Sequence, residues 1–184
     1  MKYLFPVLVL SLSLHALPAL AEEEFSSSQP LSLFEEPLTD EWKSNNENIP
    51  AFEAELDPSK VKQGSSSGKW TAEGKSNPWL FLKQCPTDWS SYEALSFWLF
   101  SENANGQIVN ITVNSDSGYY LSQVHVDWQG WQHVIIPFEE FKTPRKTEGW
   151  DNISSFMISL KGYGQEEPLT DTVLYFDDLK LVRR

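Results

Sequence analysis

Side chains suited to hydrogen bonding recur at every second position in three stretches of the chain, residues 107–114, 119–126 and 153–161. Side chains two residues apart in a β-strand project from the same face. If the three stretches are strands of one sheet, one side of that sheet collects a polar set with a tyrosine at each end. The set consists of Asn110, Thr112, Asn114, Tyr119, Gln123, His125, Ser159, Lys161 and Tyr163.

This polar set has the chemistry of a binding site for a neutral sugar. Amide side chains offer donors and acceptors to hydroxyl groups, and aromatic rings offer a flat apolar surface. Trp98 points opposite to Phe97 and Leu99, so it either packs under a loop or stands on the ligand face. We therefore predict a site made of Trp98, Asn110, Thr112, Tyr119, Gln123, His125, Lys161 and Tyr163. The alternative for each residue is an ordinary solvated sheet face.

The same strand leaves a catalytic alternative open. The run Gln123-Val124-His125 resembles the Q-I-H motif of jelly-roll alginate lyases, in which glutamine and histidine flank the uronate and a tyrosine transfers the proton. A lyase must also neutralise a carboxylate, but the only arginines are Arg145, Arg183 and Arg184. The R-x-E-L strand of those lyases is absent, as are G-x-S-x-G, H-E-x-x-H and P-loop patterns. The expectation is a protein without catalysis, with a small lyase using His125 as the alternative.

The elements that must position these residues are short strands. Runs rich in β-branched and aromatic residues are separated by glycine, proline, serine and asparagine, and no long helical pattern occurs. We predict about nine or ten strands in an all-β, two-sheet antiparallel sandwich, because an open sheet would expose too much apolar surface. The expected strands cover 31–36, 51–56, 70–73, 79–82, 94–100, 107–114, 119–126, 131–136, 153–161 and 172–182.

Residues 118–138 predict a hairpin. Two arms of aromatic and β-branched residues flank the sequence Asp127 to Gly130, which is typical of a tight turn, and Pro137 ends the second arm. The first arm, residues 119–126, carries Gln123 and His125 on its outward side. The DWQGW turn between the arms is interpreted as scaffold.

The N-terminus has the pattern of a secretory signal peptide over residues 1–21. Lys2 precedes an apolar run, and Ala19-Leu20-Ala21 forms a cleavage site. The run is too short for a membrane span, and no later stretch is long and apolar enough to insert. The predicted location is secreted or periplasmic. Residues 22–30 are expected to form a disordered lead-in, and residues 31–184 the folded domain.

The composition narrows the class of ligand. Fourteen basic against 26 acidic residues give a net charge of −12, which argues against nucleic acids and anionic membranes. A strongly anionic sugar is also disfavoured unless calcium or a local basic pocket intervenes. Eight tryptophans fit both the core of a sandwich and sugar binding, and counting does not separate the two uses. Cys85, the only cysteine, is expected to be a small buried residue.

Five sequence stretches in order resemble the galactose-binding-like β-jelly-roll domains that serve as carbohydrate-binding modules. They are GSSSGKW, DWSSYEALSFWLFS, VDWQGWQHVIIPFEEF, WDNISSFMISLKGYG and TVLYFDDLKLV, and the resemblance runs from about Leu33 to Val182. It implies a secreted protein that binds a poly- or oligosaccharide, more readily neutral than strongly anionic, in association with a secreted glycan-degrading enzyme. A module that binds another protein remains the third alternative.

The resemblance also implies a structural calcium ion between the first and last strands. The matching acidic residues are Glu35 or Glu36 in LSLFEE and Asp177 in YFDDLKL. Calcium takes several oxygen ligands, and paired acids at a strand junction would otherwise repel one another. The alternative is that these acids face water at a sheet edge.

Overall fold

The computed structural model describes residues 25–46, 49, 51–72, 79–162, 164 and 167–183, and eleven strands lie within them. These are β1 (Ser27–Ser32), β2 (Trp42–Ser44), β3 (Glu53–Glu55), β4 (Ser67–Thr71), β5 (Leu80–Leu82), β6 (Ala94–Ser101), β7 (Gln107–Ser115), β8 (Tyr119–Val126), β9 (Gly130–Pro137), β10 (Ile153–Ser159) and β11 (Val173–Arg183). The only helices in this part are single turns, α1 (Leu38–Glu41), η1 (Pro58–Lys60) and η3 (Phe138–Glu140). None of the described helices has the length and apolar character needed to cross a membrane.

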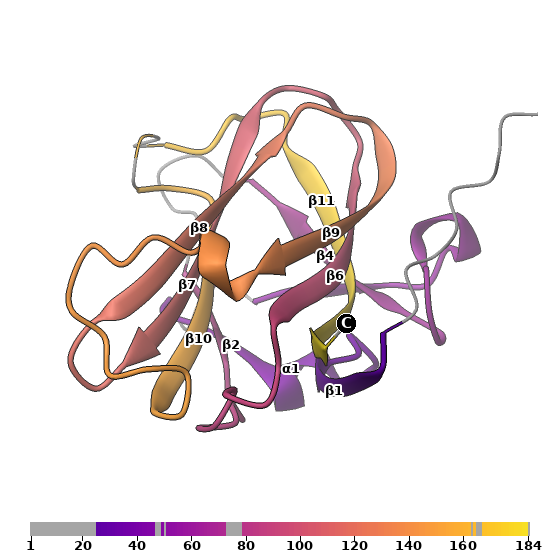
Figure 1. Cartoon of the computed structure of the whole chain (residues 1–184). Coiled ribbons are helices and arrows are strands. Elements are labelled where there is room, and N and C mark those ends of the chain that lie inside the picture. The colour runs from indigo at the N-terminus through magenta and orange to yellow at the C-terminus, as the bar shows by residue number, and fades with distance from the viewer. Residues whose placement is uncertain are drawn as a thin grey trace, which may run out of the picture.

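The strands form two antiparallel sheets that face each other (Figure 1). Sheet A has the order β3-β4-β11-β6-β9, with β1 also paired to β11, and sheet B has the order β2-β5-β10-β7-β8. The predicted class, an all-β two-sheet antiparallel sandwich, is therefore confirmed. Apart from the consecutive pairs β3–β4 and β7–β8, the neighbouring strands within each sheet come from distant parts of the sequence.

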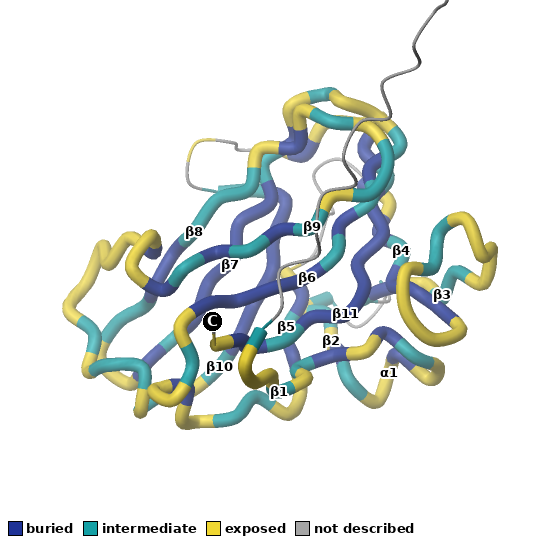
Figure 2. The backbone as a smooth tube through the Cα atoms, turned by 45° about the vertical axis from the view of Figure 1, so that its right-hand side comes forward, coloured by how far each residue is buried: buried dark blue, intermediate teal, exposed yellow. Residues whose placement is uncertain are grey.

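The core between the sheets follows from the two-residue period of the strands. In β7, Val109, Ile111 and Val113 are fully buried and face sheet A, while the residues between them face outward. Aromatic rings fill the wider part of the core, including Phe34, Trp42, Phe52, Trp70, Trp89, Phe97, Phe156 and Phe176. Figure 2 shows the central strands buried and the connecting loops exposed. Burial raises the pKa of the Cys85 thiol to about 12, in agreement with an unreactive cysteine.

The prediction of a hairpin over residues 118–138 is wrong. The two arms exist as β8 and β9, but β8 pairs with β7 in sheet B, whereas β9 pairs with β6 in sheet A. The turn at residues 127–129 thus carries the chain from one sheet to the other. Both arms bury apolar side chains between the sheets, which a local sequence pattern cannot distinguish from pairing with each other.

The beginning of the folded domain also differs from the prediction. Residues 27–30, expected in a disordered lead-in, belong to β1 and pair with residues 180–183 of β11. Strand pairing is made by backbone groups, so a serine-rich sequence with little apolar surface can still form a strand at the edge of a sheet. The predicted signal peptide, residues 1–21, lies outside the described residues.

Candidate functional site

The three strands that carry the predicted polar set are neighbours in sheet B, in the order β10-β7-β8. Their outward side chains, together with those of β2 and β5, form a surface that we call the open face. It consists of Lys43, Phe81, Ile108, Asn110, Thr112, Asn114, Tyr119, Leu121, Gln123, His125, Ser155, Met157 and Ser159. The structure therefore brings together Asn110, Thr112, Tyr119, Gln123 and His125, as the alternation of the sequence predicted. Lys161 follows β10 by two residues, and Tyr163 lies outside the described residues.

An amide pair lies at the middle of the open face. Asn110 and Gln123 are opposite each other in β7 and β8, and Gln123 Nε2 donates to Asn110 Oδ1 at 3.0 Å. Asn110 is fully buried, and its Nδ2 donates to the Gly162 carbonyl at 3.5 Å. Gln123 is only half-buried, so this pair holds a polar group in a fixed orientation at the surface. A fixed amide can meet a hydroxyl group without losing conformational freedom on binding.

A second row crosses the whole open face through paired residues. From one edge of sheet B to the other, the row consists of Lys43, Phe81, Met157, Thr112, Leu121 and Lys142. Residues directly opposite each other in antiparallel strands share a face, so Lys142 extends the row beyond β8 although it belongs to no strand. Thr112 Oγ1, in the centre, is buried and has no hydrogen-bond partner. The row is thus apolar in its middle, with one unpaired hydroxyl and a lysine at each end.

Two aromatic residues lie on the same side as this row. Trp79 immediately precedes β5, and the two-residue period places it on the side of Phe81. Its side chain is 41% exposed, and Asn45 fixes its backbone because Asn45 Oδ1 accepts from the Trp79 amide at 2.8 Å. Tyr119 stands opposite Asn114 at the start of β8 and is half-buried. These two rings can supply the flat surface that a pyranose ring needs.

Sequence reasoning missed several members of this face. Trp79, Phe81, Met157, Lys43 and Lys142 are not among the residues predicted from the sequence. The strand containing Lys43 has three residues, too few to show an alternating pattern. The position of Lys142 depends on its bridge to Leu121, which no local sequence pattern records.

A small pocket lies at the edge of the open face, where β8 meets the segment after η3. Its volume is about 240 Å³, and its lining consists of Leu121, Ser122, Gln123, His125, Glu140 and Lys142. No arginine is among the residues that line it, and Glu140 brings a negative charge. The groups that a lyase needs to neutralise a uronate and relay a proton are therefore poorly represented around His125. The pocket instead offers the hydrogen-bonding side chains of Ser122, Gln123 and His125 beside the apolar Leu121.

Trp98 does not join the other predicted residues, because it lies on the outward side of sheet A. Its ring stacks on His133 with centroids 4.5 Å apart, and Lys62 Nζ lies 3.9 Å from the ring centroid. His133 and Lys62 therefore both contact the indole ring of Trp98. Of the two interpretations offered by the sequence, packing beneath a loop describes its position.

The outward side of sheet A is covered by residues 57–66. Lys60 Nζ contacts the Phe100 ring at 3.5 Å and forms an ion pair with Glu102 at 2.7 Å. Trp131 Nε1 donates to the Ser59 carbonyl at 3.2 Å, so the same segment is also held by β9. We call residues 57–66 the covering segment. Its contacts occupy part of the Trp98, Phe100 and Trp131 rings, and a pocket of about 180 Å³ remains beside Trp98 and His133.

The acidic residues predicted to hold calcium anchor this covering segment. Asp177 Oδ2 accepts from the backbone amides of Lys62 and Gln63 at 2.7 and 2.9 Å, and Glu35 Oε1 accepts from the Ser65 amide at 2.9 Å. The hydrogen bonds from Ser65 hold the pKa of Glu35 below its ordinary value. Glu36 is exposed. No cluster of three or more histidine, cysteine or acidic side chains suited to a metal occurs in the described part of the chain.

Asp177 nevertheless retains one feature that fits a cation. The residue is fully buried, and its Oδ1 has no hydrogen-bond partner. Burial raises the pKa of this carboxyl, although the amides of the covering segment act in the opposite direction. Calcium takes several oxygen ligands, of which Asp177 Oδ1 can supply one.

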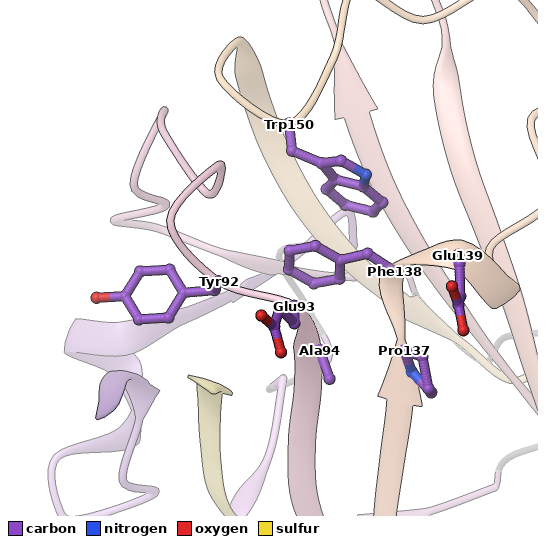
Figure 3. Close-up of a pocket in the computed structure, with 7 residues that line it drawn as sticks. All are labelled: Tyr92, Glu93, Ala94, Pro137, Phe138, Glu139 and Trp150. Carbon is purple, nitrogen blue, oxygen red and sulfur yellow. The ribbon is translucent and has the colours of Figure 1, made fainter. Parts of the chain in front are cut away.

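A cavity of about 410 Å³ lies where the end of β9 and the start of η3 meet the start of β6, and not on the open face (Figure 3). Its lining consists of Tyr92, Glu93, Ala94, Pro137, Phe138, Glu139 and Trp150. Trp150 is stacked between Tyr120 and Phe138, with centroid distances of 3.9 and 4.1 Å. Both faces of this indole are therefore used for packing, and none of the predicted site residues lines the cavity.

Comparisons with known structures agree with this architecture. The family 11 carbohydrate-binding module of the cellulosomal cellulase Lic26A-Cel5E of Clostridium thermocellum matches with a TM-score of 0.63 and 17% identity, covering 86% of this chain and 95% of that one. The module from that organism in complex with a β-1,3-1,4-mixed-linked tetrasaccharide matches with a TM-score of 0.60 at 17% identity, over 85% and 95% of the two chains.

A third match is a family 28 module specific for non-crystalline cellulose, with a TM-score of 0.53 and 15% identity over 82% of this chain and 92% of that one. At these identities the likenesses establish the jelly-roll fold. A sequence comparison with curated proteins found no match.

The sequence itself matches the model of the carbohydrate binding domain (family 11) over residues 23–164. This span includes the open face from Lys43 to Lys161 and most of both sheets. Domains of this kind bind carbohydrate and carry no catalytic centre, which agrees with the surroundings of His125. The chain belongs to the family 11 carbohydrate-binding domains, and it is a non-catalytic carbohydrate-binding protein.

Proposed function

We propose that this protein holds its glycan on the open face of sheet B. The observation that carries the proposal is the convergence there of the Asn110–Gln123 amide pair, the unpartnered Thr112 hydroxyl and the exposed Trp79 ring. On the outward side of sheet A the covering segment contacts Trp98, Phe100 and Trp131, and the pocket of about 180 Å³ beside Trp98 is smaller than the pocket at the edge of the open face. A sheet is also a rigid support, which limits the entropy lost when a ligand is bound.

Each part of the face has a separate task in this proposal. Trp79 and Tyr119 stack on pyranose rings, and the apolar row of Phe81, Met157 and Leu121 excludes water beneath the sugar. The amides orient the chain through its hydroxyl groups, since every polar group left unpaired in the complex lowers affinity. His125, exposed at the end of β8, adds a hydrogen bond at the edge.

The ligand we propose is a poly- or oligosaccharide whose sugars are largely neutral. The net charge of −12 supports this, because a densely charged polyanion would be repelled by the protein as a whole. A similar module is known in complex with a β-1,3-1,4-mixed-linked tetrasaccharide, which makes a β-linked glucan the first ligand to examine. A secreted glycan-degrading enzyme is the partner that such binding would assist.

Affinity electrophoresis tests the proposal with soluble polysaccharides cast into native gels. Mixed-linkage β-glucan, β-1,4-mannan and β-1,4-galactan would be compared with a gel without polysaccharide. Trp79→Ala and His125→Ala should each reduce the retardation, because both side chains are exposed on the open face. Gln63→Ala, an exposed glutamine of the covering segment on the outward side of sheet A, is the matched control. Equal retardation of all variants would place the glycan elsewhere.

The protein is also proposed to be secreted and to bind calcium. We propose that residues 1–21 direct secretion and are removed, which the mass of the protein recovered from the periplasm or medium would test. Calcium is proposed to bind Asp177 Oδ1 together with carbonyl oxygens of the covering segment, supported by the lack of another partner for this buried atom. Treatment with EDTA should then lower Tm, and an unchanged Tm would contradict calcium binding.

A further inference from the structure

The charge of the open face is opposite to that of the whole protein. Acidic residues outnumber basic ones by 26 to 14 in the chain, yet no aspartate or glutamate projects from strands β2, β5, β7, β8 and β10 on this side. The face carries Lys43 at one edge and Lys142 at the other, and His125 lies near the second. The positive charge of the open face matters because a ligand bound there lies closer to these groups than to the remaining charges of the protein.

The two lysines lack the ion pairs that three other described bases form. Lys60, Lys180 and Arg183 each lie within 4 Å of a carboxylate oxygen, at 2.7, 2.6 and 3.9 Å. Within the described chain neither Lys43 nor Lys142 forms such an ion pair, and Lys43 Nζ lies 5.9 Å from the Phe81 ring centroid instead. Both lysines are exposed. Their charges are therefore available to a ligand that lies along the row.

The spacing of the charges restricts the kind of anion. The row from Lys43 to Lys142 contains six residues in successive pairing, so it spans roughly 24 Å at about 4.8 Å for each step. Between the two ends the row is apolar and has only the Thr112 hydroxyl. A glycan with a charge on every sugar would bury charges against Phe81, Met157 and Leu121, at a cost in desolvation. A chain with sparse charges avoids this cost.

Resting on the proposed function of the open face, we propose that the glycan is neutral over its central sugars and carries occasional uronic-acid units. One carboxylate is met by Lys142 in the edge pocket, where Gln123 and His125 offer further hydrogen-bond donors. A second carboxylate is met by Lys43 at the opposite edge. Glu140 lines the same pocket as Lys142, and its negative charge repels a carboxylate there. The preference for a polymer with uronic-acid units is therefore modest.

The test uses matched pairs of polymers. Mixed-linkage β-glucan, β-1,4-mannan and β-1,4-galactan are each prepared unmodified and with a small fraction of their primary C6 hydroxyls oxidised to carboxylate. Affinity electrophoresis and isothermal titration calorimetry then compare both forms with the full chain. We expect the oxidised form of the preferred polymer to bind about two- to five-fold more tightly, a gain typical of exposed ion pairs. The gain should disappear at about 1 M salt, where charges are screened within about 3 Å.

Variants separate this inference from the proposed function. Lys142→Ala and Lys43→Ala should each lower the ratio of the affinity for the oxidised polymer to the affinity for the unmodified polymer. Glu140→Gln should increase the gain, and Lys69→Ala, on β4 of sheet A, should have no effect. Equal or weaker binding of the oxidised form would overturn the inference and leave the proposed function intact. Absence of binding to every polymer in either form would overturn both.

Discussion

Replacing Gln123 by alanine should affect stability as well as glycan binding, because of what lies beneath it. Gln123 Nε2 donates to Asn110 Oδ1 at 3.0 Å, and Asn110 is fully buried. Without this donor the buried oxygen loses its hydrogen bond, and an unsatisfied buried polar group costs about 1–3 kcal/mol. Since the glutamine is only half-buried, water reaches part of the vacated space, so the lower half of that range, about 1–2 kcal/mol, is expected. For a domain of this size this lowers Tm by about 2–8 °C.

The assay is thermal unfolding of Gln123→Ala beside two matched variants. His125→Ala removes an exposed side chain from the same strand and face, and surface changes of this kind stay within about 0.5 kcal/mol. Gln63→Ala removes an exposed glutamine from the covering segment over sheet A and should leave both Tm and glycan affinity unchanged. Gln123→Ala should therefore lower Tm and affinity, whereas His125→Ala lowers affinity alone. A Tm for Gln123→Ala equal to that of Gln63→Ala would refute the role assigned to the amide pair.

Three further predictions concern other parts of the molecule. Thr112→Val replaces a buried hydroxyl that has no partner, so it should raise Tm by about 2–4 °C and reduce glycan affinity. An unchanged affinity would show that the hydroxyl does not contact the sugar. Trp131→Phe removes the hydrogen bond to Ser59 and should increase proteolysis within the covering segment without changing glycan affinity, as limited proteolysis would reveal. The hydrogen bond from Lys60 holds the pKa of Glu102 below the ordinary value for a glutamate, so this stabilisation is present above that ordinary pKa and is lost as the pH falls through the lowered pKa. Glu102→Gln should accordingly flatten the dependence of Tm on pH in this acidic range, and a curve parallel to that of the wild type would contradict the assignment.

The sequence was most informative where a strand is long and faces the core on one side only. In β7 the alternation of Val109, Ile111 and Val113 with amides and hydroxyls predicted which residues lie in the core and which lie outside. The same period in β8 placed Gln123 and His125 correctly on the outward side. Burial enforces this pattern, because a shift by one residue would place every apolar side chain in water.

Pairing between strands could not be predicted in the same way. The arms of the expected hairpin, β8 and β9, satisfy the alternation of a hairpin, yet each finds its partner in a different sheet. Trp98 also shows this limit, since its outward orientation was apparent from the alternation but the sheet to which it belongs was not. Local patterns specify the face of a residue within its strand, whereas the identity of the neighbouring strand depends on contacts between distant segments.

The two outward faces acquire different roles from the same architecture. Sheet A is crossed by the covering segment, whose amides bind Asp177 and whose lysines lie over Phe100 and Trp98. Aromatic rings on that side therefore stabilise the fold, although their composition resembles that of a sugar-binding surface. In sheet B the segment after η3 joins the edge through the bridge between Leu121 and Lys142 and the hydrogen bond from Ser117 Oγ to the Lys146 carbonyl, and so extends the open face instead of covering it. The position of a connecting segment, and not the number of aromatic residues, thus determines which sheet is available to a glycan.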